Sequence, residues 1–123
     1  MKKVIAIATL LLFLLPTQVN ARTYIDYGLM KCTAYCPCVS CSDNYGRQTH
    51  SGKMATAGRT IAVDPSIIDI GSKVKIGDHI YTAEDTGGAV KGDVIDIFFD
   101  THEEVKAFAD GKGILYKHCW VVK

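Results

Sequence analysis

The sequence contains no long apolar run and no clear excess of charge of either sign. Its longest apolar run, Val4 to Leu15, is only about a dozen residues, whereas a membrane-spanning helix needs roughly 20. The 123 residues include 14 Lys and Arg and 13 Asp and Glu, a formal net charge of +1. A chain without a surplus of basic residues is a poor candidate for binding nucleic acid. The composition therefore argues against a stable membrane span and against a nucleic-acid partner.

Linkers, repeats and low-complexity segments are also missing. The chain has only three prolines, and no stretch of it is rich in Pro and Ser. Nothing therefore divides the sequence into several domains. About 100 residues are enough for one domain with a modest hydrophobic core.

The N-terminus has the features of a secretory signal peptide. Two lysines precede the apolar run, Pro16 follows it, and Val19-Asn20-Ala21 ends with small residues where cleavage would occur. We therefore expect residues 1–21 to be removed and residues 22–123 to form the mature domain. Because both early lysines are lost, the mature chain has a formal charge near −1. The expected location is secreted or in the cell envelope.

Cysteines are the most unusual part of the composition. Five remain after cleavage: Cys32, Cys36, Cys38, Cys41 and Cys119. In a small exported domain the first expectation is disulfide bonds, with one thiol left over. Zinc is the alternative, since Cys38 and Cys41 have the spacing of a zinc knuckle, and Cys36 or the His118-Cys119 pair could complete a tetrahedron. The pattern favours disulfides, and either interpretation makes the Cys-rich segment 32–41 structural.

Short strands are expected to dominate the rest of the chain. β-Branched or alternating segments predict strands at residues 60–63, 73–76, 79–84, 93–99 and 114–123. Gly77-Asp78 fits a two-residue hairpin turn, and residues 42–60 read as loop with at most one short strand. A helix is predicted from Thr101 to Gly111, because Thr101 and Glu104 have the spacing of a capping box. We expect a mainly β protein, a small barrel with one short C-terminal helix.

Asp96 is the most conspicuous carboxylate in the sequence. In its predicted strand it shares one face with Val94 and Phe98, and the opposite face is also apolar. Burial there raises the pKa of a carboxyl group unless a partner stabilises the charge. Asp64 and Asp85 each follow a predicted strand, so the three carboxylates could converge. Like charges nearby would keep Asp96 protonated to higher pH, which general-acid catalysis requires.

Structural roles are the alternative for each aspartate. Asp64 and Asp85 can form turns or cap helices, as aspartates at strand ends often do. A partner such as Lys91, His118 or backbone amides could hold Asp96 for a purely structural purpose. The pattern alone does not choose between these roles and catalysis.

The sequence Asp85-Thr86-Gly87 also matches half of an aspartic-protease site. Glu84 precedes it, however, and adds charge where that site has a hydrophobic residue. Only a short remainder of chain follows to build a peptide-binding groove. Both features argue against a protease.

Several motifs together make the chain resemble the 3D domain family, which is named for three aspartates. They are TAYCPC at 33–38, SG at 51–52, IAVDP at 61–65, GSKV at 71–74, AEDTGGAVKG at 83–92 and IDIFF at 95–99. The family is similar to the catalytic domain of MltA-type lytic transglycosylases and to stationary-phase muralytic proteins of Gram-positive bacteria. The resemblance extends from about residue 30 to the end of the chain. It implies a six-stranded double-psi β-barrel and places the family aspartates at Asp64, Asp85 and Asp96.

The resemblance also implies an activity, the lytic cleavage of peptidoglycan glycan strands. Asp96 corresponds to the single catalytic acid, with Asp85 and Asp64 tuning its pKa, ordering loops or stabilising charge on the sugar. The C6 hydroxyl of N-acetylmuramic acid, rather than water, attacks the anomeric carbon and leaves a 1,6-anhydro end. No metal or organic cofactor is needed for this reaction.

Five further residues match family-like positions around the cleft and are implied as substrate contacts: Thr33, Tyr35, Ser51, Thr86 and Lys91. Strand packing for Tyr35 and turn hydrogen bonds for Ser51 and Thr86 are equally good explanations. The dense cysteine cluster departs from many family members, which leaves the geometry of the N-terminal strand open.

Two other functions remain open. A wall-binding, expansin-like module would have the barrel and groove without cleaving glycan, although the presence of all three aspartates favours the enzyme. A hydrolase on the same barrel would leave reducing ends. The motifs are compatible with a homodimer as well as with a monomer.

Overall fold

The computed structural model describes residues 14–18 and 21–123, and most of the predicted signal peptide lies outside these residues. The elements in chain order are β1 (Tyr24–Tyr35), α1 (Val39–Ser42), β2 (Thr60–Val63), β3 (Lys73–Ile76), β4 (His79–Asp85), β5 (Val94–Phe98), α2 (His102–Ala107) and β6 (Leu115–Val122). Each strand predicted from the sequence is present, with bounds that differ by one residue at most. None of the described residues belongs to a helix long and apolar enough to cross a membrane.

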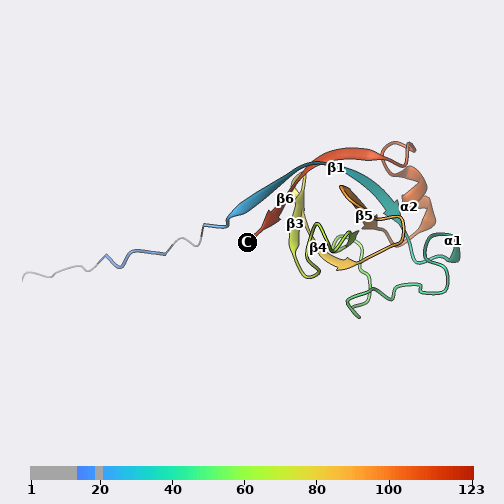
Figure 1. Ribbon diagram of the computed structural model, residues 1–123, viewed down its shortest axis with the longest axis horizontal. Coiled ribbons are helices and arrows are strands. Elements are labelled where there is room, and N and C mark those ends of the chain that lie inside the picture. Colours follow the sequence, from blue (N-terminus) through green and yellow to red (C-terminus); the bar gives the residue numbers. More distant parts are fainter. Residues whose placement is uncertain (1–13, 19–20) are drawn as a thin grey trace, which may run out of the picture.

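The six strands form a closed, mixed β-barrel (Figure 1). Their order around the barrel is β1-β5-β2-β4-β3-β6, which mixes parallel and antiparallel pairs. Closure pairs every strand on both sides, so that no edge is left open to other chains. The predicted mainly β barrel is confirmed.

The long strand β1 connects two parts of the barrel. Its N-terminal portion pairs antiparallel with β6, beginning at Tyr24 opposite Val122. Its C-terminal portion pairs parallel with β5, ending at Tyr35 opposite Phe98. As a result, the residues that follow β1 and those that follow β5 emerge at the same end of the barrel, where both short helices lie (Figure 1).

Side chains from alternate strand positions fill the barrel. The buried cluster contains Met30, Cys32, Ile61, Val63, Ile68, Val74, Ile76, Ala83, Ile95, Ile97, Cys119 and Val121. Ile95 and Ile97 both belong to it, so the face of β5 that carries Asp96 points away from this core, as the period of two residues requires.

The hairpin between β3 and β4 has the predicted turn. Ile76 pairs with His79, which leaves Gly77 and Asp78 as the two turn residues. Gly77 has φ of 60°, a left-handed conformation that glycine adopts without steric cost. The turn chemistry therefore sets the register of these two strands.

Two short helices are present where the sequence predicted one. In α2 the predicted capping box is confirmed, because the Thr101 side chain accepts a hydrogen bond from the Glu104 amide and the Glu104 side chain accepts one from the Thr101 amide. The helix ends at Ala107, before the predicted Gly111. The single turn of α1 was not predicted, because its sequence, VSCS, is too short to show a helical period.

The expected disulfides are absent, although all five cysteines lie within residues 21–123. Cys32 and Cys119 are buried free thiols in the core, where such groups pack as small hydrophobes. The other three sulfurs gather beside α1 and α2 instead of pairing with this core pair. The prediction failed because sequence spacing does not show which cysteines meet in space.

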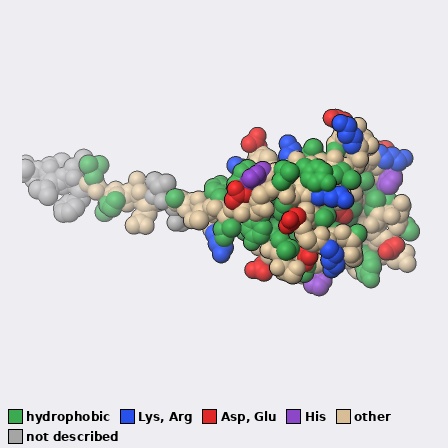
Figure 2. Space-filling model, turned by 45° about the horizontal axis from the view of Figure 1, so that its top comes forward, with side chains coloured by type: hydrophobic (Ala, Val, Ile, Leu, Met, Phe, Trp, Pro, Cys, Tyr) green, Lys and Arg blue, Asp and Glu red, His purple; other side chains and the backbone are tan. Residues whose placement is uncertain are grey.

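The surface has no dominant charge. Figure 2 shows acidic and basic side chains interspersed on the face in view. This distribution agrees with the formal net charge of +1. A continuous basic face, the usual feature of nucleic-acid binding, is not seen in this view.

Replacing Thr101 by Ala should lower the free energy of unfolding by about 1 kcal/mol, because the exposed first turn of α2 loses its capping hydrogen bonds. Glu103→Gln is the matched control. It changes a charge in the same turn but leaves the Thr101–Glu104 contacts in place, so a change of only a few tenths of a kcal/mol is expected. Urea denaturation measures both, and equal losses in the two variants would contradict the capping role.

Candidate active site

Two aspartates flank a small residue on three neighbouring strands. Ala62 of β2 pairs with Asp96 of β5 on one side and with Asp85 of β4 on the other. Adjacent strands lie about 4.8 Å apart, so the two aspartate backbones are about 10 Å apart across Ala62. All three residues line the same cavity. The short side chain of Ala62 leaves the space between the carboxyl groups open.

Asp96 lies half-buried on the cleft side of β5. Within the described residues its one side-chain partner is Thr33 of β1, whose hydroxyl donates a hydrogen bond of 2.8 Å to Oδ1. Burial raises the pKa of Asp96 to about 6, with a smaller upward contribution from Asp85, and the bond from Thr33 opposes the shift. The sequence-based expectation that this carboxyl group holds its proton to higher pH is in agreement with the structure.

Asp85, at the end of β4, has a different environment. It accepts hydrogen bonds from the Tyr35 hydroxyl at 2.9 Å, from the His50 amide at 3.0 Å and from the Thr86 amide at 2.9 Å. Three donors directed at one group are the pattern that an ionised carboxylate requires. Burial and the neighbouring Asp85 raise the pKa of Tyr35, so this phenol remains a donor.

Asp64 does not join the other two aspartates in the cavity wall. Its carboxylate accepts bonds from the amide and hydroxyl of Ser66 at 3.0 and 2.7 Å and from the amide of Gly92 at 2.8 Å. These bonds, that from Gly92 above all, lower the pKa of Asp64 to about 2. Gly92 has φ of 69°, which favours glycine, so Asp64 holds a turn just before β5.

Asp85 and Asp96 lie in a cleft with a cavity of about 560 Å³. One wall is the segment 86–90, and the other is the loop that follows α1, residues 43–50. Arg47 fixes this loop against the barrel through an ion pair of 2.9 Å with Asp100 and by stacking over the Phe98 ring at 5.3 Å. The cleft wall is therefore attached to the end of β5.

The predicted substrate contacts divide into two groups. Tyr35 and Thr86 line the cavity, and Thr33 contacts Asp96 directly. Ser51 and Lys91 are exposed and do not line it. Ser51 bonds within its own turn, as the alternative interpretation proposed, through a contact of 3.0 Å with Thr49.

The proposed structural partners of Asp96 are not those found. Neither Lys91 nor His118 is hydrogen-bonded to it. His118 contacts Asp26, whose pKa is lowered mainly by the amide of Gly28. Glu84, which precedes Asp85, points to the opposite face of β4, where Arg59 and Thr60 bind its buried carboxylate.

Sequence reasoning missed the loop that forms the second wall. Its cavity-lining residues are Asp43, Tyr45, Gly46, Gln48, Thr49 and His50. The segment has no regular period, and its polar composition indicated only a loop. A tyrosine and a histidine within a polar loop were the only signals available.

Chemically, the cleft combines one half-buried carboxyl group whose pKa is raised to about 6 with one that accepts three hydrogen bonds. The pair is suited to proton donation followed by stabilisation of positive charge, because its two members have different environments. Solvent can reach both groups through the open cavity.

Comparisons with known proteins identify the family and the fold of the chain. Residues 59–120 match the 3D domain family. Two Bacillus subtilis (strain 168) proteins are similar. "Putative cell wall shaping protein YabE" is 42% identical over 69 residues, which cover 54% of this chain and 17% of YabE. "Cell wall-binding protein YocH" is 56% identical over 41 residues, which cover 32% of this chain and 14% of YocH. The matches thus span less than a fifth of either relative.

Solved structures show the same architecture. MltA from E. coli superposes with a TM-score of 0.51 at 26% identity over 62% of this chain and 27% of MltA. The lytic transglycosylase LtgG of Burkholderia pseudomallei gives 0.52 at 27% identity over 61% of this chain and 26% of LtgG. A structure of E. coli MltA with bound chitohexaose gives 0.53 at 25% identity, over 62% and 27% of the two chains. The chain therefore belongs to the 3D domain family, and its barrel has an MltA-like fold.

Proposed function

We propose that this protein is an exported lytic transglycosylase that cleaves peptidoglycan between N-acetylmuramic acid and N-acetylglucosamine. The observation that carries the proposal is Asp96, a half-buried carboxyl group in an open cleft, whose pKa is raised to about 6 chiefly by burial. Such a group can donate a proton at neutral pH and can also take one back.

The reaction needs no second catalytic carboxylate and no water. Asp96 donates its proton to the glycosidic oxygen, the bond between that oxygen and C1 of N-acetylmuramic acid breaks, and N-acetylglucosamine leaves as an alcohol. The C6 hydroxyl oxygen of the same muramyl residue then forms a bond to C1 and gives its proton to the Asp96 carboxylate. The acid is thereby regenerated, and the product carries a 1,6-anhydro end.

Asp85 is proposed to act as an electrostatic partner. Its negative charge, on the far side of Ala62, can stabilise the oxocarbenium-like transition state that glycosidic cleavage passes through. The same charge raises the pKa of Asp96 and so favours the protonated acid. The Tyr35 hydroxyl and two backbone amides keep this carboxylate in place.

Asp64 is proposed as a positioning residue. Its carboxylate binds the amide of Gly92, two residues before β5 begins, and so ties the end of β2 to the start of the strand that carries Asp96. Loss of Asp64 would disturb the path of the segment 86–92, which includes one wall of the cleft. Its effect on catalysis would then be indirect.

The cleft also offers groups for binding sugars. Tyr45 is a large exposed aromatic side chain that lines the cavity, and aromatic rings of this kind can pack against the apolar face of a pyranose. Gln48, Thr49 and Thr86 supply neutral donors and acceptors around it. The names of YabE and YocH, which refer to shaping and binding the cell wall, support a wall polysaccharide as substrate and a location in the cell envelope.

A wall-binding module without catalysis is the second candidate. The observation in its favour is the similarity to YocH, whose name records binding to the cell wall. The same cleft would then hold a glycan strand without cleaving it. Product analysis separates the two functions.

Purified peptidoglycan incubated with the chain from Arg22 onward should release muropeptides with 1,6-anhydro ends, lighter by one water than hydrolytic products. Asp96→Asn should lower release by roughly 100-fold or more, because the amide cannot donate the proton. Asp93→Asn, an exposed aspartate one residue before β5, is the control and should remain active. Reducing-end products would indicate a hydrolase, and binding to the wall without release would indicate the binding module.

Substitutions of two neighbours of Asp96 should shift its pKa in opposite directions. Asp85→Asn should lower the pKa of Asp96, because a nearby negative charge is removed. Thr33→Val should raise it, because the hydrogen bond to the carboxylate is lost while the shape is kept. Carbon-detected NMR titration of the Asp96 carboxyl group measures both shifts. Shifts in the same direction would show that the assigned causes are wrong.

The raised pKa of Asp96 also predicts a cost in stability. An unfolded aspartate has a pKa near 4, whereas Asp96 has about 6 when folded, so the unfolded chain loses this proton first and stability falls as pH rises between these values. Asp96→Asn should therefore be more stable than the wild type at pH 7.5, on the order of 2 kcal/mol, and the gain should disappear near pH 3. Urea denaturation at both pH values tests this.

Asp93→Asn is again the matched control, because the exposed side chain should change stability little and equally at both pH values. A gain for Asp96→Asn that is the same at both pH values would point to packing rather than to a buried charge.

A further inference from the structure

Three cysteines and one histidine lie close together at one end of the barrel, separate from the three aspartates. Cys36 and Cys38 follow β1, Cys41 lies in α1, and His102 is the first residue of α2. Their ligand atoms all lie within 4.8 Å of one another. We propose that Cys36, Cys38, Cys41 and His102 form a structural zinc site.

The distances match a tetrahedral site. The three sulfurs lie 3.7, 3.5 and 3.5 Å from Nδ1 of His102. With Zn–S bonds of about 2.3 Å and a Zn–N bond of about 2.0 Å, tetrahedral angles require sulfur and nitrogen to be about 3.5 Å apart. The imidazole nitrogen is therefore already at ligand distance from all three sulfurs. The Cys36 and Cys38 sulfurs, at 3.1 Å, must separate by about 0.6 Å to reach the spacing of a zinc tetrahedron.

The backbone holds the cysteines in place. In the turn of α1 the carbonyl of Cys38 accepts bonds from the amides of Cys41 and Ser42 at 3.1 and 2.9 Å. The Ser42 hydroxyl donates a bond of 2.6 Å to the carbonyl of Cys36, which folds that residue back over the turn. The chain from Cys38 to Cys41 thus forms a tight turn. The zinc interpretation of the Cys38-x2-Cys41 spacing requires such a turn.

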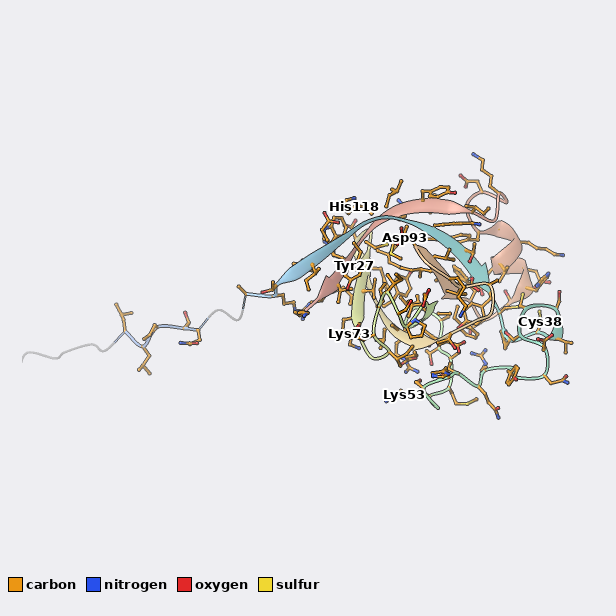
Figure 3. The ribbon with its side chains drawn as sticks, in the orientation of Figure 1. Tyr27, Cys38, Lys53, Lys73, Asp93 and His118 are labelled. Atoms are coloured by element: carbon orange, nitrogen blue, oxygen red, sulfur yellow. The ribbon has the colours of Figure 1, made fainter. Side chains whose placement is uncertain are left out.

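His102 reaches the cluster for a separate reason. It follows Thr101, whose capping box fixes the start of α2. Parallel pairing of β1 with β5 brings the chain after Phe98 next to the chain after Tyr35. Of the residues in the zinc alternative, Cys36, Cys38 and Cys41 lie together, whereas His118 lies at the other end of the barrel from Cys38 (Figure 3).

Zinc fits this set of ligands better than a disulfide. A disulfide between any two of the three cysteines would leave the third thiol beside His102 without a covalent partner. Three soft sulfurs and one imidazole are a typical zinc ligand set, and four protein ligands close the coordination sphere to water. Binding would release the thiol protons of the three cysteines to solvent.

A closed site acts through structure. Zinc here would join the end of β1, the turn of α1 and the start of α2. Cys41 also lines the cleft, at the base of the loop that forms one wall. The metal would therefore fix that wall and take no part in the chemistry of Asp96.

The test is metal analysis of the chain from Arg22 onward, which contains every strand of the barrel. Expressed and purified under reducing conditions, it should retain one zinc per chain by elemental analysis. Cobalt should replace zinc and give the visible bands of a tetrahedral ion together with thiolate charge-transfer absorption. Removing the metal with a chelator should lower the melting temperature, by on the order of 10 °C, and added zinc should restore it.

Two matched pairs of variants control the test. Cys41→Ala and His102→Gln should lose the metal and the zinc-dependent rise in melting temperature, whereas Cys32→Ala and His118→Gln should keep both, because these residues lie away from the cluster. Circular dichroism of each variant shows whether the barrel has formed. The cobalt spectrum of the wild type needs no variant at all.

Several outcomes would overturn the proposal. A wild-type chain without zinc that also fails to bind added zinc or cobalt is one of them. Another is a mass lower by two hydrogens with a Cys36–Cys38 or Cys38–Cys41 disulfide. A third is metal retention in both Cys41→Ala and His102→Gln. None of these outcomes depends on glycan cleavage.

Discussion

Strand β5 is hydrogen-bonded to β1 on one side and to β2 on the other, and this double pairing determines where Asp96 lies. One face of the strand supplies Ile95 and Ile97 to the core, so the alternation of side chains directs Asp96 to the opposite face. There it is half-buried and, in the part of the chain that the structure describes, has a single side-chain partner, Thr33. The acid is thus positioned by backbone pairing, not by a network of side chains.

The three aspartates show how local surroundings separate identical side chains. Asp64 accepts three short hydrogen bonds and its pKa is lowered to about 2, whereas Asp96 accepts one and its pKa is raised to about 6 by burial. Keeping an acid in an apolar environment lowers the stability of the folded state. The barrel tolerates this loss because it is closed, with each strand hydrogen-bonded on both sides. A carboxyl group that weakens the fold is typical of a functional site.

The sequence was sufficient for five of the six strands, the hairpin turn and the capping box, because each depends on neighbours within a few residues; the long strand β1 was not among those predicted. The period of two also singled out Asp96, since both faces of its strand are apolar. The Cys–His cluster and the second wall of the cleft could not be predicted in the same way. His102 joins Cys36 only because β1 and β5 are parallel neighbours, a relation between segments more than 60 residues apart. Pairings of that kind depend on the whole barrel.

Strand β1 connects the two chemical sites of the molecule. Its last residues, Thr33 and Tyr35, contact Asp96 and Asp85, and the next residue is Cys36. All three aspartates and His102 lie within the segment that matches the family, residues 59–120, whereas Thr33, Tyr35 and the three clustered cysteines precede it. The carboxylates therefore belong to the part shared with the family, while the preceding segment supplies the side-chain hydrogen-bond donors to Asp96 and Asp85. A metal at the end of β1 would hold those partners against the acid from just outside the cleft.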